Sequence, residues 1–158
     1  MKQPPTSSVE FRTVCAKPLN VMDVDAFLQT FILWVAKQQS IEGLALVGSH
    51  AQGMAAEASD VDLIILTSER DEYLGNIDWL SQFGEVEWFQ KETWGTVETI
   101  RATYSNGLEV EYNFAVPSWA EVPVDPGTRR VVREGFKILF DPQRKLDELI
   151  KQVSDVSN

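Results

Sequence analysis

The spacing of apolar residues changes along the chain, and each change marks a different kind of element. Between Asp23 and Gln38, apolar residues return at the three- and four-residue spacing of one helix face. Asp23, or Asn20 just before it, is suited to cap the start of such a helix. We therefore expect a helix over 23–38 that packs on a sheet formed by the strands after it.

Two short apolar runs follow this helix. Leu44 to Val47 is a continuous apolar run, and Val61 to Leu66 is a second run rich in branched residues. We interpret both as buried strands. The small residues from Ala51 to Ala56 lie between them and predict a short helix packed tightly against the sheet.

The second half of the chain contains more strand signals. Residues 85–94 and 97–104 are predicted as strands on either side of Gly95. Ser105-Asn106-Gly107 is a hairpin signal that joins the second of these strands to another over 108–114. The remaining elements are expected to be a helix over 77–83, a helix start at 117–120, a helix over 127–134, a strand over 136–140 and a helix over 145–153.

These elements predict an α/β (α+β) fold in which helices back a mixed β-sheet on one side. A length of 158 residues and 44% hydrophobic content suit one globular domain with a proper core. Residues 1–17 are polar and contain prolines, which predicts a loose N-terminal arm. The domain is then expected to cover 18–158.

Polar residues gather after the end of the first apolar run and at the start of the second. Gly48 lets the backbone approach a ligand, and Ser49 lies where a helix begins, so its hydroxyl and the free N–H groups there suit a phosphate. Asp60 and Asp62 are two residues apart, which places both carboxylates on one face of a strand. Such a pair beside a phosphate indicates a bound cation, and Mg²⁺ fits this role.

A plainer interpretation accounts for either half of this pattern alone. Gly-Ser can be a turn and a helix cap, and two acids can mark the solvent-facing start of a strand. The two halves occur together, with ten residues between Ser49 and Asp60 and apolar runs on both sides. This combination favours a nucleotide site.

The pattern resembles the nucleotidyltransferase fold of the DNA polymerase beta superfamily. The likeness is greatest to its small bacterial members, the minimal and the aminoglycoside nucleotidyltransferases. Those proteins often read Gly-Ser-x-Ala-Arg-Gly before Ser-Asp-x-Asp, and this chain reads GSHAQG at 48–53 and SDVD at 59–62. The chain departs from the pattern at Gln52, where the Arg is missing.

The resemblance implies a Mg²⁺-dependent enzyme that moves a nucleoside monophosphate from an NTP to a hydroxyl group and releases pyrophosphate. It implies that Asp60 and Asp62 are catalytic and bind two Mg²⁺ ions, and that a third acid lies on a neighbouring strand. Glu109 and Glu111 both fit, because alternation places them on one face with Asn113. We choose Glu111, which lies deeper in the strand, and keep Glu109 as the alternative.

Other residues are candidates for nucleotide binding. Gly48 and Ser49 would hold the outer phosphates. Arg129 and Arg133 share a helix face and would hold the triphosphate tail, although a solvated face paired with nearby acids is the commoner role of such arginines. Trp94 and Trp119 are candidates to stack on a base, whereas most tryptophans belong to a core or its rim.

Charge and composition limit the partners. A formal net charge of -10 argues against a long nucleic acid as substrate, although many cytosolic proteins are simply acidic. The single Cys15, the absence of a signal-peptide pattern and the lack of a long apolar segment predict a cytoplasmic protein without a membrane partner.

The acceptor remains open between a small molecule, aminoglycoside-like in the resemblance, and a protein. A second copy of the chain in a homodimer could complete the acceptor site. The alternative function is that of an antitoxin-like or regulatory protein, which would bind a helical protein partner as minimal nucleotidyltransferases do. The sequence alone does not separate these functions.

Overall fold

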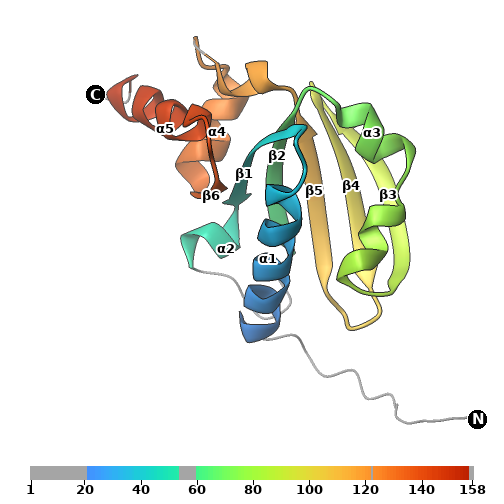
Figure 1. The fold of residues 1–158 in the computed structure, drawn as a ribbon. Helices are drawn as coiled ribbons and strands as arrows, with labels where there is room; N and C mark the ends of the chain where they lie inside the picture. The colour runs from blue at the N-terminus through green and yellow to red at the C-terminus, as the bar shows by residue number, and fades with distance from the viewer. Residues whose placement is uncertain (1–20, 54–59, 122, 157–158) are drawn as a thin grey trace, which may run out of the picture.

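The computed structural model describes residues 21–53, 60–121 and 123–156, and its centre is a six-stranded sheet (Figure 1). The strand order is β3-β4-β5-β2-β1-β6. Only β2 and β5 pair in parallel among these neighbours. The strands are β1 (Ile41–Val47), β2 (Val61–Thr67), β3 (Val86–Trp94), β4 (Val97–Tyr104), β5 (Glu109–Ala115) and β6 (Phe136–Phe140).

Helices connect the strands and cover the sheet. The α-helices are α1 (Val21–Ala36), α2 (Ser49–Gln52), α3 (Arg70–Gly75), α4 (Pro126–Glu134) and α5 (Lys145–Val156). The 3₁₀ helices are η2 (Asp78–Phe83) and η3 (Pro117–Ala120). No helix in the described ranges is long and apolar enough to cross a membrane.

One face of the sheet packs against α1, α3 and η2 through aromatic side chains. Phe31 of α1 is fully buried and lies 5.4 Å, centroid to centroid, from the ring of Tyr112 on β5. The Tyr112 hydroxyl lies 2.8 Å from the hydroxyl of Tyr104, which donates a hydrogen bond to the Leu80 carbonyl at 2.9 Å. The polar ends of both tyrosines are therefore satisfied inside the core.

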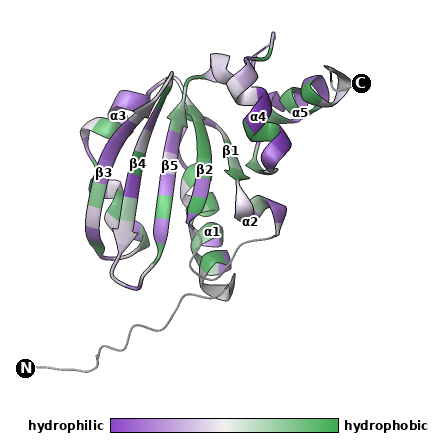
Figure 2. Ribbon diagram, turned by 180° about the vertical axis from the view of Figure 1, so that it is seen from behind, coloured by the Kyte–Doolittle hydropathy of each residue, from purple (hydrophilic) through white to green (hydrophobic). Residues whose placement is uncertain are grey.

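The opposite face is covered by α4, α5 and η3, but only over the β1, β2 and β6 side. Leu146 and Leu149 of α5 are fully buried in a second core cluster with Ala45 and Leu66. The expectation of helices on one side only therefore differs from the structure. Figure 2 shows the reason: β1 and β2 are mainly hydrophobic along their length, and strands of this kind are buried on both faces.

Most predicted elements are present, with shifted ends. The strand over 97–104 is β4, and the predicted strands and helices over 85–156 all have counterparts. The first strand begins at Ile41 rather than Leu44, and 77–83 is a 3₁₀ helix. Helix α3 was not predicted. The arm over 1–17 lies outside the described residues, as does the end of the small helix expected over 51–56.

Candidate active site

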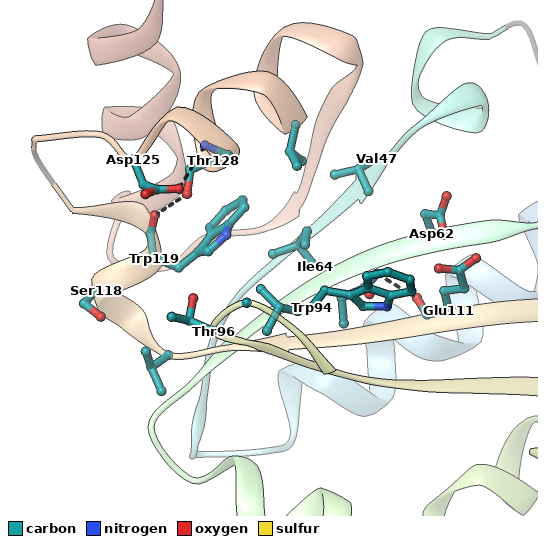
Figure 3. Close-up of a pocket in the computed structure, with 16 residues that line it drawn as sticks. Val47, Asp62, Ile64, Trp94, Thr96, Glu111, Ser118, Trp119, Asp125 and Thr128 are labelled. Carbon is teal, nitrogen blue, oxygen red and sulfur yellow. Dashed lines mark hydrogen bonds between the residues drawn. The ribbon is translucent and has the colours of Figure 1, made fainter. Parts of the chain in front are cut away.

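Two carboxylates meet on the face of the sheet that α1 does not cover. Asp62 on β2 and Glu111 on β5 are direct partners in the parallel register, and both line one pocket (Figure 3). Val110 and Tyr112, on either side of Glu111 in β5, point to the opposite face of the sheet and are fully buried. The alternation of β5 thus holds Glu111 on the pocket face, as the sequence predicted.

Arg101 joins these acids and was missed by sequence reasoning. It lies opposite Glu111 in the antiparallel β4–β5 pair. Its Nη1 is 2.8 Å from Glu111 Oε2 and 3.1 Å from Asp60 Oδ2, while its Nη2 is 3.5 Å from Glu92 Oε1. The signal that could have found it is the alternation of 97–104, which places Arg101 on the polar face beside the acidic strand.

Gly48 is required where it stands because of Asp62. The backbone of Gly48 has φ +76°, and a Cβ there would lie 3.0 Å from Asp62 Oδ2. The Gly48 N–H donates to the Gly135 carbonyl at 3.3 Å, which fixes this turn against the start of β6. Glycine at this position therefore leaves Asp62 room that any side chain would take.

Asp62 and Glu111 are both harder to ionise than ordinary carboxyl groups. Burial, followed by the charge of Asp62, raises the pKa of Glu111 to about 7. Burial also raises the pKa of Asp62; a hydrogen bond with Glu111 opposes the rise, and the charge of Asp60 adds to it. Asp62 Oδ1 is buried without a hydrogen-bond partner among the described residues. A cation beside Asp62 and Glu111 would favour their ionised forms and would give Asp62 Oδ1 a partner.

The donor set fits Mg²⁺ in part. Mg²⁺ takes oxygen ligands and is usually bound through one or two carboxylates together with substrate phosphates. Asp62 and Glu111 supply such a pair, and Asp62 Oδ1 is an oxygen without a partner. Across the described ranges, no group of three or more Asp, Glu, His or Cys is arranged to hold a metal ion. Asp60, the third candidate ligand, does not line the pocket, and its Oδ2 lies 3.1 Å from Arg101 Nη1.

The pocket extends away from the acids along the sheet. Its volume is about 740 Å³, within the usual range for small-molecule sites. Asn113 lines it in a fixed orientation, because it accepts a 2.6 Å hydrogen bond from Thr99 and donates one of 2.8 Å to the Leu63 carbonyl. Trp119 and Thr128 form the far end (Figure 3).

The far end is built by the start of α4. The Asp125 side chain accepts a 2.9 Å hydrogen bond from the Gly127 N–H and so caps this helix. Thr128 is buried and donates to the Trp119 carbonyl at 3.2 Å, which ties α4 to η3. Trp94 reaches the same pocket from the end of β3 and is 58% exposed.

The other predicted residues lie apart from this pocket. Ser49 begins the four-residue helix α2 and does not line it. Arg129 and Arg133 line a separate hollow of about 380 Å³, because Gly127, Thr128 and Val131 are the α4 residues that line the pocket. Glu109 pairs with Thr103, two residues before Glu111 along β5; it is exposed and does not line the pocket, but its side chain forms a hydrogen bond with Asp60.

A family comparison agrees with this geometry. A family model described as a nucleotidyltransferase domain matches residues 29–111, more than half of the 158-residue chain. The matched segment contains Gly48, Asp62, Arg101 and Glu111. The chain therefore belongs to the nucleotidyltransferase domain family. No curated protein matches it.

Several solved structures are similar to this chain. The chain is similar to an aminoglycoside 6-adenyltransferase from Bacillus subtilis, at 14% identity and a TM-score of 0.50 over 65% of this chain and 37% of that one. It thus spans a little over a third of that protein. A nucleotidyltransferase-like protein from Exiguobacterium sibiricum has 16% identity and a TM-score of 0.43, covering 84% of this chain and 38% of that one. A toxin–antitoxin structure with AMP-PNP has 12% identity and a TM-score of 0.39, covering 88% and 87%.

Proposed function

We propose that this nucleotidyltransferase-family protein moves a nucleoside monophosphate from an NTP to a hydroxyl group of a small molecule or a protein. The observation that carries the proposal is the Asp62–Glu111 pair, which lies at one end of a pocket large enough for a nucleotide. In the reaction the acceptor oxygen forms a bond to the α-phosphorus. The bond from the α-phosphorus to the bridging oxygen breaks, and its electron pair leaves with pyrophosphate.

Asp60, Asp62 and Glu111 would hold Mg²⁺, as two ions when the site is fully loaded. Bound Mg²⁺ supplies positive charge to the attacking and leaving oxygens. The sheet supports this assignment, because its hydrogen-bonded register fixes Asp62 and Glu111 on neighbouring strands before any ligand arrives. Such pre-organisation lowers the free-energy cost of assembling the charged site.

Glu111 is the residue proposed to take the proton from the acceptor hydroxyl. A general base works best when its pKa lies near the operating pH, and burial raises the pKa of Glu111 to about 7. Asp62 is the neighbouring carboxylate whose charge contributes to this shift. The pair therefore divides into one carboxylate that binds and one that also moves a proton.

The NTP is proposed to lie along the pocket with its base toward the tryptophans. Trp94 and Trp119 both line the pocket and offer flat faces for stacking. Gly48 and Ser49, at the end of β1, would hold the phosphates next to Asp62. Arg129 and Arg133 would reach the outer phosphates only from their separate hollow, so their part in nucleotide binding is the least direct.

Thermal unfolding with non-hydrolysable NTP analogues tests the proposal without knowledge of the acceptor. Ligand at about a hundredfold over its Kd should add roughly 2.7 kcal/mol to the free energy of unfolding, which raises Tm by several degrees. The stabilisation should require Mg²⁺ and should be lost in Asp62→Asn. Asp25→Asn, an exposed change on α1 at the opposite face, is the matched control and should keep it. If no NTP analogue stabilises the protein in the presence of Mg²⁺, the proposed nucleotide site is wrong.

A further inference from the structure

We propose that Arg101 is an internal counter-ion that holds the acidic site together without metal and is displaced toward Glu92 when a divalent cation binds. The inference rests on the proposed metal site and adds a residue that the family pattern of acids does not include. Arg101 is a positioning residue in this account, because it acts through the carboxylates.

The contacts of Arg101 place it among the proposed ligands. One guanidinium nitrogen, Nη1, bridges Asp60 Oδ2 at 3.1 Å and Glu111 Oε2 at 2.8 Å. All three side chains are partly shielded, at 27%, 30% and 19% exposure, so the attraction between them is stronger than at an open surface. The guanidinium thus supplies the positive charge that these acids need in the absence of metal.

A bound divalent cation and the bridging guanidinium compete for the same carboxylates. Mg²⁺ holds carboxylate oxygens at about 2.1 Å, and a dication at that distance repels a guanidinium that contacts the same groups. The bridge also keeps one carboxylate oxygen of Asp60 and one of Glu111 engaged with Nη1. Arg101 must therefore release at least one of the two acids when the metal enters.

Glu92 provides the position to which Arg101 can move. Its Oε2 accepts a 3.0 Å hydrogen bond from Gln90 on the same strand, and this contact orients the carboxylate. Its Oε1 is buried, has no hydrogen-bond partner within the part of the chain that the structure describes, and lies 3.5 Å from Arg101 Nη2. A small side-chain rotation away from Asp60 would convert this long ion pair into a hydrogen-bonded one.

The proposal predicts opposite effects from the two partners of one ion pair. Loss of Arg101 removes a competitor of the metal, so metal binding should tighten. Loss of the Glu92 charge removes the position that receives Arg101, so metal binding should weaken. If Arg101 served only to hold the acids in place, its loss would weaken metal binding instead.

Mn²⁺ binding to the full chain, measured by the EPR signal of free Mn²⁺, tests the first effect. Arg101→Gln should bind Mn²⁺ about fivefold tighter than wild type, as expected for release of a partly shielded ion pair. Arg144→Gln makes the same change in net charge at a surface ion pair with Asp147 and should change affinity much less. Equal or weaker binding by Arg101→Gln, relative to Arg144→Gln, overturns the inference.

Glu92→Gln tests the second effect and does not depend on the folding of an Arg101 variant. It should bind Mn²⁺ about threefold more weakly than Glu98→Gln. Glu98 lies on the same hairpin and contacts Thr93 rather than Arg101, so it is the matched control. Equal binding by these two variants also overturns the inference.

A separate variant distinguishes failure of the inference from failure of the proposed function. Asp62→Asn should lose Mn²⁺ binding whether or not Arg101 moves. If wild type and Asp62→Asn bind Mn²⁺ equally, the metal site itself is wrong and the inference falls with it. If only the Arg101 and Glu92 variants fail to respond, the metal site stands and the displacement is wrong.

Discussion

Asp62 and Glu111 lie directly opposite each other in the parallel β2–β5 pair, although α3, η2, β3 and β4 separate them along the chain. Their carboxylates share one end of the pocket, and burial raises the pKa of both. The fold therefore holds two acids together at a cost to its own stability. Such a cost is typical of residues kept for function.

This cost predicts the effect of Asp62→Asn on the metal-free protein. The substitution removes one of two partly buried carboxylates that lie side by side, so the free energy of unfolding should rise by about 1 kcal/mol. Urea unfolding in EDTA at pH 8 measures it, and Asp25→Asn on the opposite face should stay near wild type. A clear loss of stability in Asp62→Asn would show that the Asp62 charge supports the fold.

Gly48→Ala should damage the site more than the fold. The new Cβ meets Asp62 Oδ2 at 3.0 Å, so Mg²⁺-dependent NTP stabilisation should be lost. Gly53→Ala is a close control, because Gly53 has a similar φ of +72° but no atom of the described residues lies within 4 Å of the added Cβ. Both variants should lose about 1–2 kcal/mol of folding free energy from backbone strain. Equal NTP stabilisation in the two variants would contradict the role of Gly48.

Trp94→Ala should weaken NTP binding about tenfold, because stacking of a base on an aromatic ring contributes roughly 1–3 kcal/mol. Trp88→Ala on the same strand is the control, since Trp88 is 48% exposed and does not line the site pocket. Isothermal titration calorimetry, which does not rely on a tryptophan signal, compares the NTP affinities of the Trp94→Ala and Trp88→Ala variants. Similar affinities for both variants would place the base elsewhere.

The tyrosine pair predicts a loss of stability at high pH. Burial raises the pKa of Tyr104 to about 12, and burial raises that of Tyr112 well above its usual value. Above about pH 10 the unfolded chain loses phenolic protons that the folded chain keeps, so the free energy of unfolding falls as pH rises from about 10 to 12. Urea unfolding across this range measures the slope. Tyr104→Phe should reduce it, and an unchanged slope would contradict the assignment.

The strands at the centre were predictable because each has a strong local signal. β1 and β2 contain the apolar runs over 44–47 and 63–66, and the alternation of β5 identified the face that carries Glu111. Helix α3 gave no such signal: it is six residues long and buries only Tyr73, so no hydrophobic period can form.

The missed parts of the site depend on tertiary structure. Arg101 meets Glu111 only through the β4–β5 register, and the local pattern around Arg101 does not say which acid it will face. Arg129 and Arg133 were predicted from their shared helix face. The structure turns that face away from the site pocket, because Thr128 and Val131 of the same helix line it.

The most direct test of the central claim follows the fate of the NTP phosphates. Wild type is incubated with Mg²⁺, fractions of a bacterial lysate as acceptors, and NTP labelled at either the α- or the γ-phosphate. The account predicts that wild type and Asp25→Asn move the α-label to an acceptor and release the γ-label only in pyrophosphate. Asp62→Asn should neither label an acceptor nor release pyrophosphate. Transfer of γ-label to an acceptor, or equal α-label transfer by Asp62→Asn, would contradict nucleotidyl transfer at the Asp62–Glu111 pair.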